Sequence, residues 1–299
     1  MHLLIAHETV YRYDRLVQRS TQYLRLTPRP GHGLKVLSWQ LTLPAPASRC
    51  LDAYGNTMHV LTLDKPVSDI HLLARGEVET DDRAPTPDPQ DELPAQLFLR
   101  DSPLTRADAA LRQFAHGHAA QVASDPLAGL LQMMQALVVV MPYTPGTTDA
   151  ATPAAEAFAN RNGVCQDHAQ VFATCARLLG LPARYVSGYM LTMPPEGQPR
   201  LIGSDASHAW TSVYVPGCND PAQDCHEPGA GDAGDAACWF DFDPTNNRSP
   251  GEDYVTLAVG RDYGDVSPMR GVIHGGARHT LHVGVTVEPV DNPAVRAPA

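Results

Sequence analysis

The chain lacks the features that would place it in a membrane or on nucleic acid. Its N-terminus carries an apolar run of only four residues before His7, too short for a signal-peptide core, and no later run is long enough to span a bilayer. It also lacks any cluster of lysine or arginine: 22 basic residues stand against 33 acidic ones and give a net charge of −11. We therefore expect no nucleic-acid partner and no membrane partner.

Cysteine is also scarce, with six residues in 299, which is too few for a disulfide scaffold. We expect free thiols in a reducing compartment instead, and with them a cytoplasmic location. Four residues between 218 and 238 could be imagined as a zinc site, but they lack the paired close spacing of structural zinc motifs. We expect neither a metal nor a disulfide at these residues, which are Cys218, Cys225, His226 and Cys238.

Residues 1–80 form the first unit of the chain. Short alternations of apolar and polar residues, separated by turn signals, predict the antiparallel strands of a small β-sandwich. The step from Tyr54 through Gly55 to Asn56 predicts a hairpin turn, because glycine and asparagine tolerate positive φ. Residues 81–104 are expected to be a linker, since its first part holds four prolines and five acidic side chains and little that could be buried.

Residues 105–291 form the second unit, in which helices come first and strands follow. The clearest helix starts at Cys165, with Gly180 as the expected C-cap and Pro182 just beyond it. The stretch 216–237 has no periodicity and predicts a surface loop. We therefore assign the α+β class, a β-sandwich-like domain followed by a mixed core. We expect helices over 105–119, 126–143, 153–160 and 165–179, strands over 183–191, 208–215, 238–243, 254–259 and 279–290, and a frayed tail over 292–299.

Three residues in separate elements suggest a catalytic triad. Cys165 opens a helix, His208 opens the strand HAWTSVYV, and Asp243 closes the strand CWFDFD. A thiol attacks a carbonyl carbon well only as thiolate, and a helix N-terminus stabilises an anion through its dipole and its free N–H groups. If the two strands pair as an antiparallel hairpin, His208 and Asp243 become neighbours. His208 would then take the thiol proton, and Asp243 would orient the imidazole.

Other residues compete for these roles. His168 lies three positions after the candidate nucleophile on the same helix and competes for the role of base. Asp241 lies on the same strand face as Asp243 and could orient the histidine instead, although the strand end suits the hairpin geometry better. Cys175 is rotated away from the active face of the helix and is expected to pack in the core.

Further residues are candidates for the oxyanion or substrate site. Asn162 and Gly163 are expected to make the tight turn before the helix, whose first N–H groups can hold the oxyanion of a tetrahedral intermediate. Tyr143 could add a second donor, although a tyrosine at a helix end more often packs as an ordinary aromatic residue. Gln166 follows the nucleophile directly. Trp210 could shield the site from water or be ordinary core, and the same holds for Trp239.

The chain resembles the bacterial transglutaminase-like superfamily, a group that includes candidate cysteine proteases, in three segments of matching order and spacing: NGVCQDHAQ, SHAW and WFDFDPTNN. Residues 7–30, followed by LSWQLTL and DAYGNTMHVLTL, resemble the small β domain that precedes the core in these proteins, and GRDYGDVSPMRGVIHGG resembles their closing segment. The resemblance implies a papain-like core with Cys165 on a helix, His208 and Asp243 on adjacent strands, and no metal or organic cofactor. His168 and Gln170 depart from the residues expected there and alter the pocket beside the thiol.

The sequence therefore predicts a thiol-dependent hydrolase that cleaves peptide or isopeptide amide bonds through an acyl-enzyme on Cys165. Its partner would be a peptide or protein amide substrate. Transfer of a protein-glutamine acyl group to an amine uses the same triad and stays open. A protein-binding module, in which the β domain docks a partner, is a further alternative, although the intact triad argues against it. The sequence leaves the substrate and the oligomeric state open.

Overall fold

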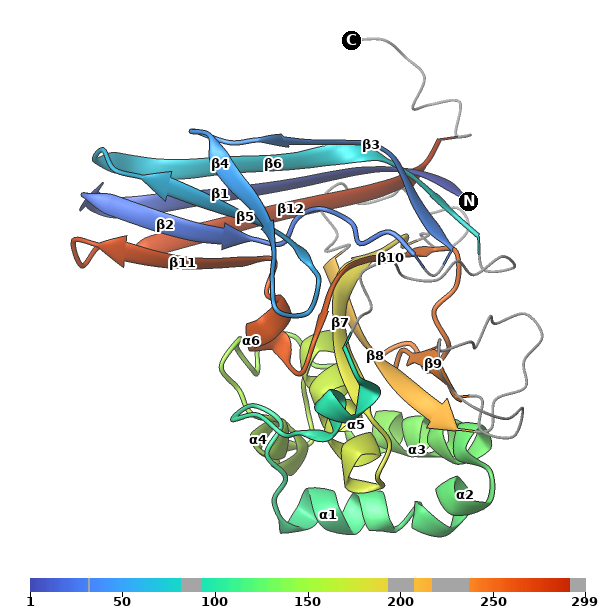
Figure 1. Cartoon of the computed structure of the whole chain (residues 1–299). Helices are drawn as coiled ribbons and strands as arrows, with labels where there is room; N and C mark the ends of the chain where they lie inside the picture. The colour runs from blue at the N-terminus through green and yellow to red at the C-terminus, as the bar shows by residue number, and fades with distance from the viewer. Residues whose placement is uncertain (32, 82–92, 193–206, 217–236, 291–299) are drawn as a thin grey trace, which may run out of the picture.

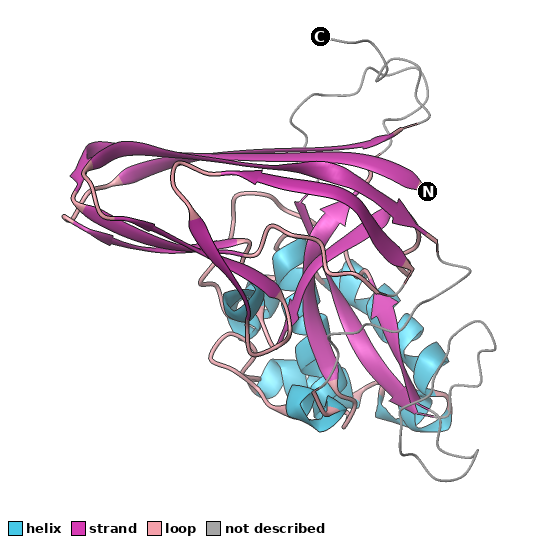
Figure 2. Cartoon of the chain, turned by 45° about the horizontal axis from the view of Figure 1, so that its top comes forward, coloured by secondary structure: helices cyan, strands magenta, loops and turns pink. Residues whose placement is uncertain are grey.

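The computed structural model describes residues 1–31, 33–81, 93–192, 207–216 and 237–290. Figure 1 shows a layered β structure at the top and a mixed unit of helices and strands beneath it. Figure 2 shows the same division by element type, because the helices gather in the mixed unit. The fold class is α+β with antiparallel sheets, as predicted.

The β unit consists of two antiparallel sheets that pack face to face. One sheet has the strand order β12-β1-β6-β3 and the other has the order β11-β2-β5-β4. Alternating residues of the strands point inward and close an apolar core that includes Leu24, Leu61, Ile70 and Leu72. The strands are β1 (His2–Val17), β2 (Arg19–Leu24), β3 (Leu34–Thr42), β4 (Ala47–Leu51), β5 (Thr57–Leu63), β6 (Val67–Thr80), β11 (Met269–His274) and β12 (His279–Pro289).

Two C-terminal strands belong to this sandwich, which corrects the division expected from the sequence. The sequence places 279–290 in the second unit and predicts no strand over 269–274. In the structure β12 pairs with β1 and β11 pairs with β2, so each strand completes an N-terminal sheet. Without them, β1 and β2 would be edge strands with unpaired N–H and C=O groups, and the end of the chain supplies the missing partners.

The structure confirms only some of the predictions made for the segments that connect the strands and the two units. β4 and β5 pair antiparallel around the predicted turn, where Gly55 has φ +77°. The expected linker is too long, because its second half forms the 3₁₀ helix η1 (Ala95–Leu99), and Phe98 is buried against Tyr54 and Trp239. Three predicted irregular segments lie mostly or wholly outside the described residues: the first part of the linker, the loop over 216–237 and the tail over 292–299.

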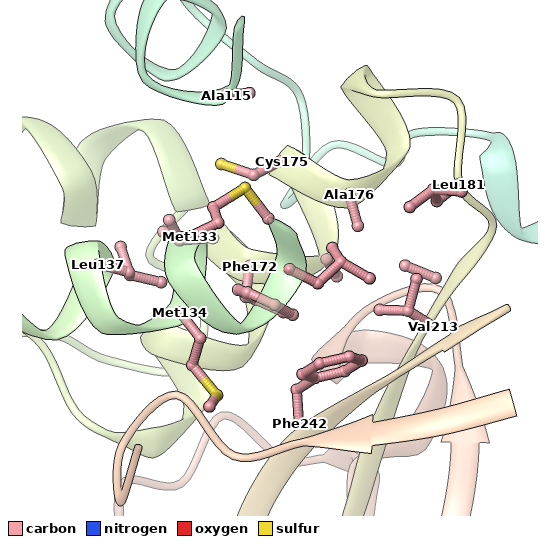
Figure 3. Packing of buried hydrophobic residues seen from close by; sticks show 14 of the residues in the cluster. Ala115, Met133, Met134, Leu137, Phe172, Cys175, Ala176, Leu181, Val213 and Phe242 are labelled. Carbon is pink, nitrogen blue, oxygen red and sulfur yellow. The ribbon is translucent and has the colours of Figure 1, made fainter. Parts of the chain in front are cut away.

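In the mixed unit, helices pack around α5 (Cys165–Leu178). Every residue of α5 from 167 to 177 is buried. Figure 3 shows Phe172, Cys175 and Ala176 of this helix surrounded by side chains of α3 and the neighbouring sheet. Among the described residues, no helix is both long and apolar enough to cross a bilayer. The other helices are α1 (Ala109–His116), α2 (Ala119–Ser124), α3 (Pro126–Val140), α4 (Ala154–Asn160) and α6 (Tyr263–Val266).

The sheet of the mixed unit has the strand order β10-β7-β8-β9. β8 and β9 pair antiparallel, with Thr211 opposite Phe242, as the hairpin prediction required. β7 pairs with β8 and β10 pairs with β7, both antiparallel. The end of β7, the start of β8, the end of β9 and the start of β10 therefore meet at one end of the sheet. The bounds are β7 (Ala183–Met190), β8 (Ser207–Pro216), β9 (Ala237–Phe242) and β10 (Tyr254–Gly260).

Packing and hydrogen bonds join the two units. Leu3 and Ile5 of β1 share one apolar cluster with Tyr189 of β7 and Val255 of β10. The turn between β4 and β5 also reaches across, because the side-chain amide of Asn56 donates to the carbonyl of Val259 at 2.8 Å and accepts from its N–H at 2.9 Å. The sandwich therefore packs against β7 and β10 of the mixed sheet.

Candidate active site

Cys165 is the first residue of α5, as predicted. Asp167 holds the helix start, because its carboxylate accepts the N–H of Val164 at 2.8 Å and the hydroxyl of Thr148 at 2.6 Å. The N–H of Asp167 donates to the carbonyl of Val164 at 3.0 Å. The N–H groups of Cys165 and Gln166 precede this first helical bond and can donate to an anion at the helix N-terminus.

The turn before α5 differs from the one expected. The sequence predicts a tight turn at Asn162 and Gly163, but the left-handed residue is Arg161, with φ 51°, which ends α4. Gly163 contributes through its small size, because a Cβ at this position would lie 2.6 Å from the Cβ of Asp167. The segment therefore needs glycine for space and not for its φ.

His208 and Asp243 meet at the end of the sheet, where the hairpin geometry predicts them. Nε2 of His208 lies 2.6 Å from Oδ2 of Asp243, and the two residues are 8% and 0% exposed. Because the carboxylate occupies Nε2, Nδ1 is the nitrogen left to face the half-buried thiol of Cys165, which is one of the groups that raise the pKa of the imidazole. The fold thus brings these three side chains together at one site.

The groups around His208 reverse the effect of its burial. Burial lowers the pKa of an imidazole, but the hydrogen bonds to Asp243 and Cys165 and the charges of both groups raise the pKa of His208 to about 9. Burial likewise favours the neutral form of Asp243, yet the hydrogen bond and charge of His208 hold the pKa of this carboxyl below its usual value. The pair therefore consists of imidazolium and carboxylate at neutral pH.

The carboxylate of Asp243 is surrounded by donors. Oδ1 accepts the backbone N–H groups of Thr245 at 2.9 Å and Asn246 at 3.2 Å. Besides His208, Oδ2 accepts the side-chain amide of Asn246 at 2.6 Å and the hydroxyl of Tyr254 at 2.6 Å. Sequence reasoning missed both side chains. The run Asp-Pro-Thr-Asn after β9 is a turn signal that could have identified Asn246, whereas Tyr254 becomes visible only with the strand order.

Trp210 lies beside the imidazole of His208, with ring centroids 6.4 Å apart and an angle of 25° between the planes. It is 1% exposed, and its Nε1 donates to Oδ2 of Asp241 at 3.1 Å. The alternative partner Asp241 thus binds Trp210, while Asp243 binds the imidazole. Gly188 lies opposite His208 in register and leaves room for the indole, since a Cβ there would lie 2.5 Å from it.

The second tryptophan considered as a shield, Trp239, takes part in the packing between the two units. The guanidinium carbon of Arg184 lies 3.7 Å from its ring centroid, and Phe98 contacts it edge-on. Together with Trp210 and Tyr254, Trp239 lines a cavity of about 200 Å³ between the sandwich and the mixed sheet. Trp210 and Tyr254, which contact His208, are among the residues that line this cavity, whereas Cys165 is not.

His168, which could compete for the role of base, and Cys175, which was expected to pack in the core, are both buried. His168 is buried, with Nε2 2.9 Å from the carbonyl of Met141 and Nδ1 3.0 Å from the hydroxyl of Thr245. Since the carbonyl accepts, Nε2 carries the proton and Nδ1 accepts from the hydroxyl. Burial lowers the pKa of His168, so this ring is neutral and connects the two groups that it bonds. Cys175 is fully buried, as predicted, and burial raises the pKa of its thiol to about 12.

Tyr143 and Gln166 border the entrance to the helix. Tyr143 forms a parallel bridge with Gly163, and its side chain is 55% exposed. The side-chain amide of Gln166 donates to the carbonyl of Asp149 at 3.3 Å, so the group that Gln166 offers to an oxyanion is its backbone N–H. The roles of these residues in an oxyanion or substrate site stay predictions.

Known proteins resemble this chain in sequence and in fold. An uncharacterized protein of Mycobacterium tuberculosis is 32% identical over 313 residues, covering 98% of this chain and 94% of the relative. The model of the bacterial transglutaminase-like N-terminal region matches residues 3–79, and that of the transglutaminase-like superfamily matches residues 115–244. The chain belongs to the transglutaminase-like superfamily.

Two further matches, one in sequence and one in structure, cover nearly the whole of this transglutaminase-like chain. An uncharacterized protein of Mycobacterium leprae is 27% identical over 302 residues, covering 95% of this chain and 97% of the relative. A solved structure from Cytophaga hutchinsonii, described as a candidate cysteine protease, has a TM-score of 0.68 and 21% identity, with coverage of 97% of this chain and 92% of that one. This second likeness establishes the fold.

Of the four cysteines in the described part of the transglutaminase-like chain, three are free as expected and one is not. Cys50, Cys165 and Cys175 are free thiols, but Cys238 is disulfide-bonded, so the prediction that no disulfide forms there was wrong. Among the described residues, no group of three histidine, cysteine or acidic side chains could hold a metal ion. The remaining residues considered for zinc lie outside the described ranges: Cys218, Cys225 and His226.

Proposed function

We propose that this protein is a thiol-dependent hydrolase that cleaves amide bonds of peptides or isopeptides through an acyl-enzyme on Cys165. One observation carries the proposal: the buried His208–Asp243 pair, hydrogen-bonded at 2.6 Å, lies next to Cys165 at the N-terminus of α5. Membership of the transglutaminase-like superfamily supports acyl transfer to and from a thiol.

In this mechanism the thiolate of Cys165 attacks the amide carbonyl carbon, and the N–H groups of Cys165 and Gln166 bind the oxyanion. The imidazolium of His208 then gives its Nδ1 proton to the leaving nitrogen as the C–N bond breaks. The neutral imidazole next takes a proton from water, whose oxygen attacks the thioester, and Cys165 leaves as thiolate. Asp243 holds Nε2 of His208 throughout and keeps the ring in one orientation.

A primary amine can replace water in the second half of this cycle. The acyl group then passes to the amine and forms a new amide, so a transglutaminase reaction needs no change in the triad. A non-catalytic binding module is the third candidate. A buried carboxylate and imidazolium would only add a desolvation cost to a pure scaffold, and this favours the two catalytic candidates.

The test compares thiols within one molecule. We expect iodoacetamide at pH 7 to label Cys165 at least about tenfold faster than the exposed Cys50, because an ordinary thiol is mostly protonated at this pH. Intact-mass and peptide mass spectrometry measure both rates, and His208→Gln should slow only the labelling of Cys165. Equal rates at Cys165 and Cys50 would contradict the catalytic proposal.

Turnover of a peptide library, with and without an added primary amine, then identifies the acceptor. Cleaved peptides that disappear with Cys165→Ala indicate hydrolysis, whereas amine-modified glutamines that disappear with the same variant indicate transfer. Cys175→Ala is the matched control, because it removes a thiol of the same helix that lies in the core.

A further inference from the structure

Tyr254 donates to the triad from a strand that carries none of the three members. It is the first residue of β10, the strand on the far side of β7 from His208. Its hydroxyl lies 2.6 Å from Oδ2 of Asp243, the same oxygen that Nε2 of His208 reaches at 2.6 Å. One carboxylate oxygen therefore serves both the imidazole and the phenol.

Packing fixes the ring that carries this hydroxyl. Tyr254 is 6% exposed, and the ring of Trp210 contacts it edge-on with centroids 5.3 Å apart. The ring of His208 lies 5.9 Å away, and the guanidinium carbon of Arg248 lies 4.8 Å from the centroid of the phenol ring. Burial and the charge of Asp243 raise the pKa of Tyr254, so the phenol stays a neutral donor.

His208 and Tyr254 share this oxygen with the amide of Asn246, and donors to one oxygen affect each other. When His208 is imidazolium, it withdraws charge from Oδ2 of Asp243, and the bond from Tyr254 weakens. When the imidazole is neutral, the oxygen carries more charge and the phenol binds it more tightly. The hydroxyl therefore stabilises the neutral imidazole more than the imidazolium.

We propose that Tyr254 is a positioning residue that fixes the carboxylate of Asp243 and limits how strongly this carboxylate stabilises the imidazolium of His208. A less stabilised imidazolium gives its Nδ1 proton more readily to the leaving amine. Tyr254 acts only through Asp243. The kinetic part of this inference rests on the proposed function, whereas the effect on the titration of His208 does not.

The other ionisable groups that surround these side chains stay in place in the test. Asp243 and Cys165 raise the pKa of His208, and the charge of His208 lowers the pKa of His168. Arg248 stacks on the phenol and pairs with Asp253. Because Tyr254→Phe keeps the ring on which these groups pack, it removes the hydroxyl alone.

The experiment follows the imidazole of His208 by NMR in ¹⁵N-histidine-labelled protein, with His208→Gln to assign the signal. In Tyr254→Phe we expect the pKa of His208 to rise by about one unit relative to the unmodified protein, since a hydrogen bond to a charged group is lost. On the amide substrate we expect kcat to fall about tenfold with little change in KM, because the proton is released less readily.

Tyr189→Phe is the matched control, because it removes a buried hydroxyl from the neighbouring strand, where Tyr189 bonds His7 at 2.8 Å. It should leave the titration of His208 unchanged. Replacing Tyr254 by 3-fluorotyrosine keeps the ring and strengthens the donor, so the pKa of His208 should fall. A titration of His208 that is the same in the unmodified protein, in Tyr254→Phe and with 3-fluorotyrosine would overturn the inference, even if Cys165 proves catalytic. Slow labelling of Cys165 with a shifted titration would instead contradict the proposed function alone.

Discussion

Two regions of the molecule bury a histidine, with opposite results. At the junction between the sandwich and the mixed sheet, His7 is 3% exposed and bonds the hydroxyls of Tyr189 at 2.8 Å and Thr9 at 3.1 Å. Burial among these neutral partners lowers the pKa of His7 to about 4. At the end of the sheet, His208 is about as buried, yet its pKa is raised to about 9.

The difference lies in the charge of the partners and not in the depth of burial. Desolvation disfavours the imidazolium in both places. Asp243 and Cys165 outweigh it at His208, whereas a hydroxyl carries no charge that could do so at His7. The junction therefore holds a neutral histidine as part of its packing, and the site holds a charged one. Removing a charged partner from a buried histidine, or adding one, should therefore shift its pKa toward that of the other histidine.

Asp243→Asn tests the larger of these effects. It replaces the carboxylate by a neutral group of similar shape, so the pKa of His208 should fall from its raised value toward that of His7, with Cys165 as the remaining group that raises it. We expect kcat to decrease by about 10⁴-fold, the loss known for the same change in other triads. NMR titration of His208 and turnover of the amide substrate measure the two results.

Asp241→Asn is the control for this prediction. Asp241 is two residues away and binds Trp210, so its replacement should leave the pKa of His208 within about half a unit, because it removes no hydrogen bond to the imidazole. A loss of activity in Asp241→Asn that equals the loss in Asp243→Asn would show that Asp241 orients the base.

The junction should respond to pH through His7. The folded pKa of about 4 lies below the ordinary value of 6.5, so the unfolded chain binds a proton more readily, and stability falls as the pH decreases from 6.5 to 4. The loss attributable to His7 should reach about 3 kcal/mol at the lower end of this window. His7→Gln does not titrate and should remove this part of the pH dependence.

Urea unfolding at pH 7.5 and pH 4 measures this loss as a difference between the two proteins. His71→Gln is the matched control, since His71 lies in the same sheet, is exposed and bonds Glu8 at 2.7 Å. The explanation by burial fails if His7→Gln and the unmodified protein lose the same free energy of unfolding between the two pH values.

The site could be predicted from the sequence as far as local signals reached. Cys165 follows from a helix with clear start and end signals, and His208 with Asp243 follows from the pairing of two consecutive strands. Tyr254 could not be found in this way. β10 lies beside β7 because Val255 and Leu257 pack against β1 and β12, and such contacts between distant parts of the chain leave no local pattern.

The same limit explains the errors in the fold. The strand from Met269 to His274 contains one glycine and is followed by two more, and its residues are half-buried or exposed, so no alternation of apolar residues marks it. Its partner is β2, some 250 residues earlier in the chain. Phe98 falls in the expected linker because the prolines and acidic residues of the first part of the linker gave no sign that its second half is ordered, but one aromatic residue suffices to anchor that segment against Tyr54 and Trp239.

His168 provides the smallest and most selective test of the comparison, because it is a third buried histidine and lies on the same helix as Cys165. It resembles His7, since burial lowers its pKa and its bonded partners, the carbonyl of Met141 and the hydroxyl of Thr245, are neutral. His168→Gln retains one donor and one acceptor for these partners. We therefore expect the alkylation rate of Cys165 at pH 7 to stay within about tenfold of the unmodified protein, since a buried hydrogen bond contributes about 1 kcal/mol. His208→Gln should lower the rate much further, and equal losses in the two variants would make His168 a second base.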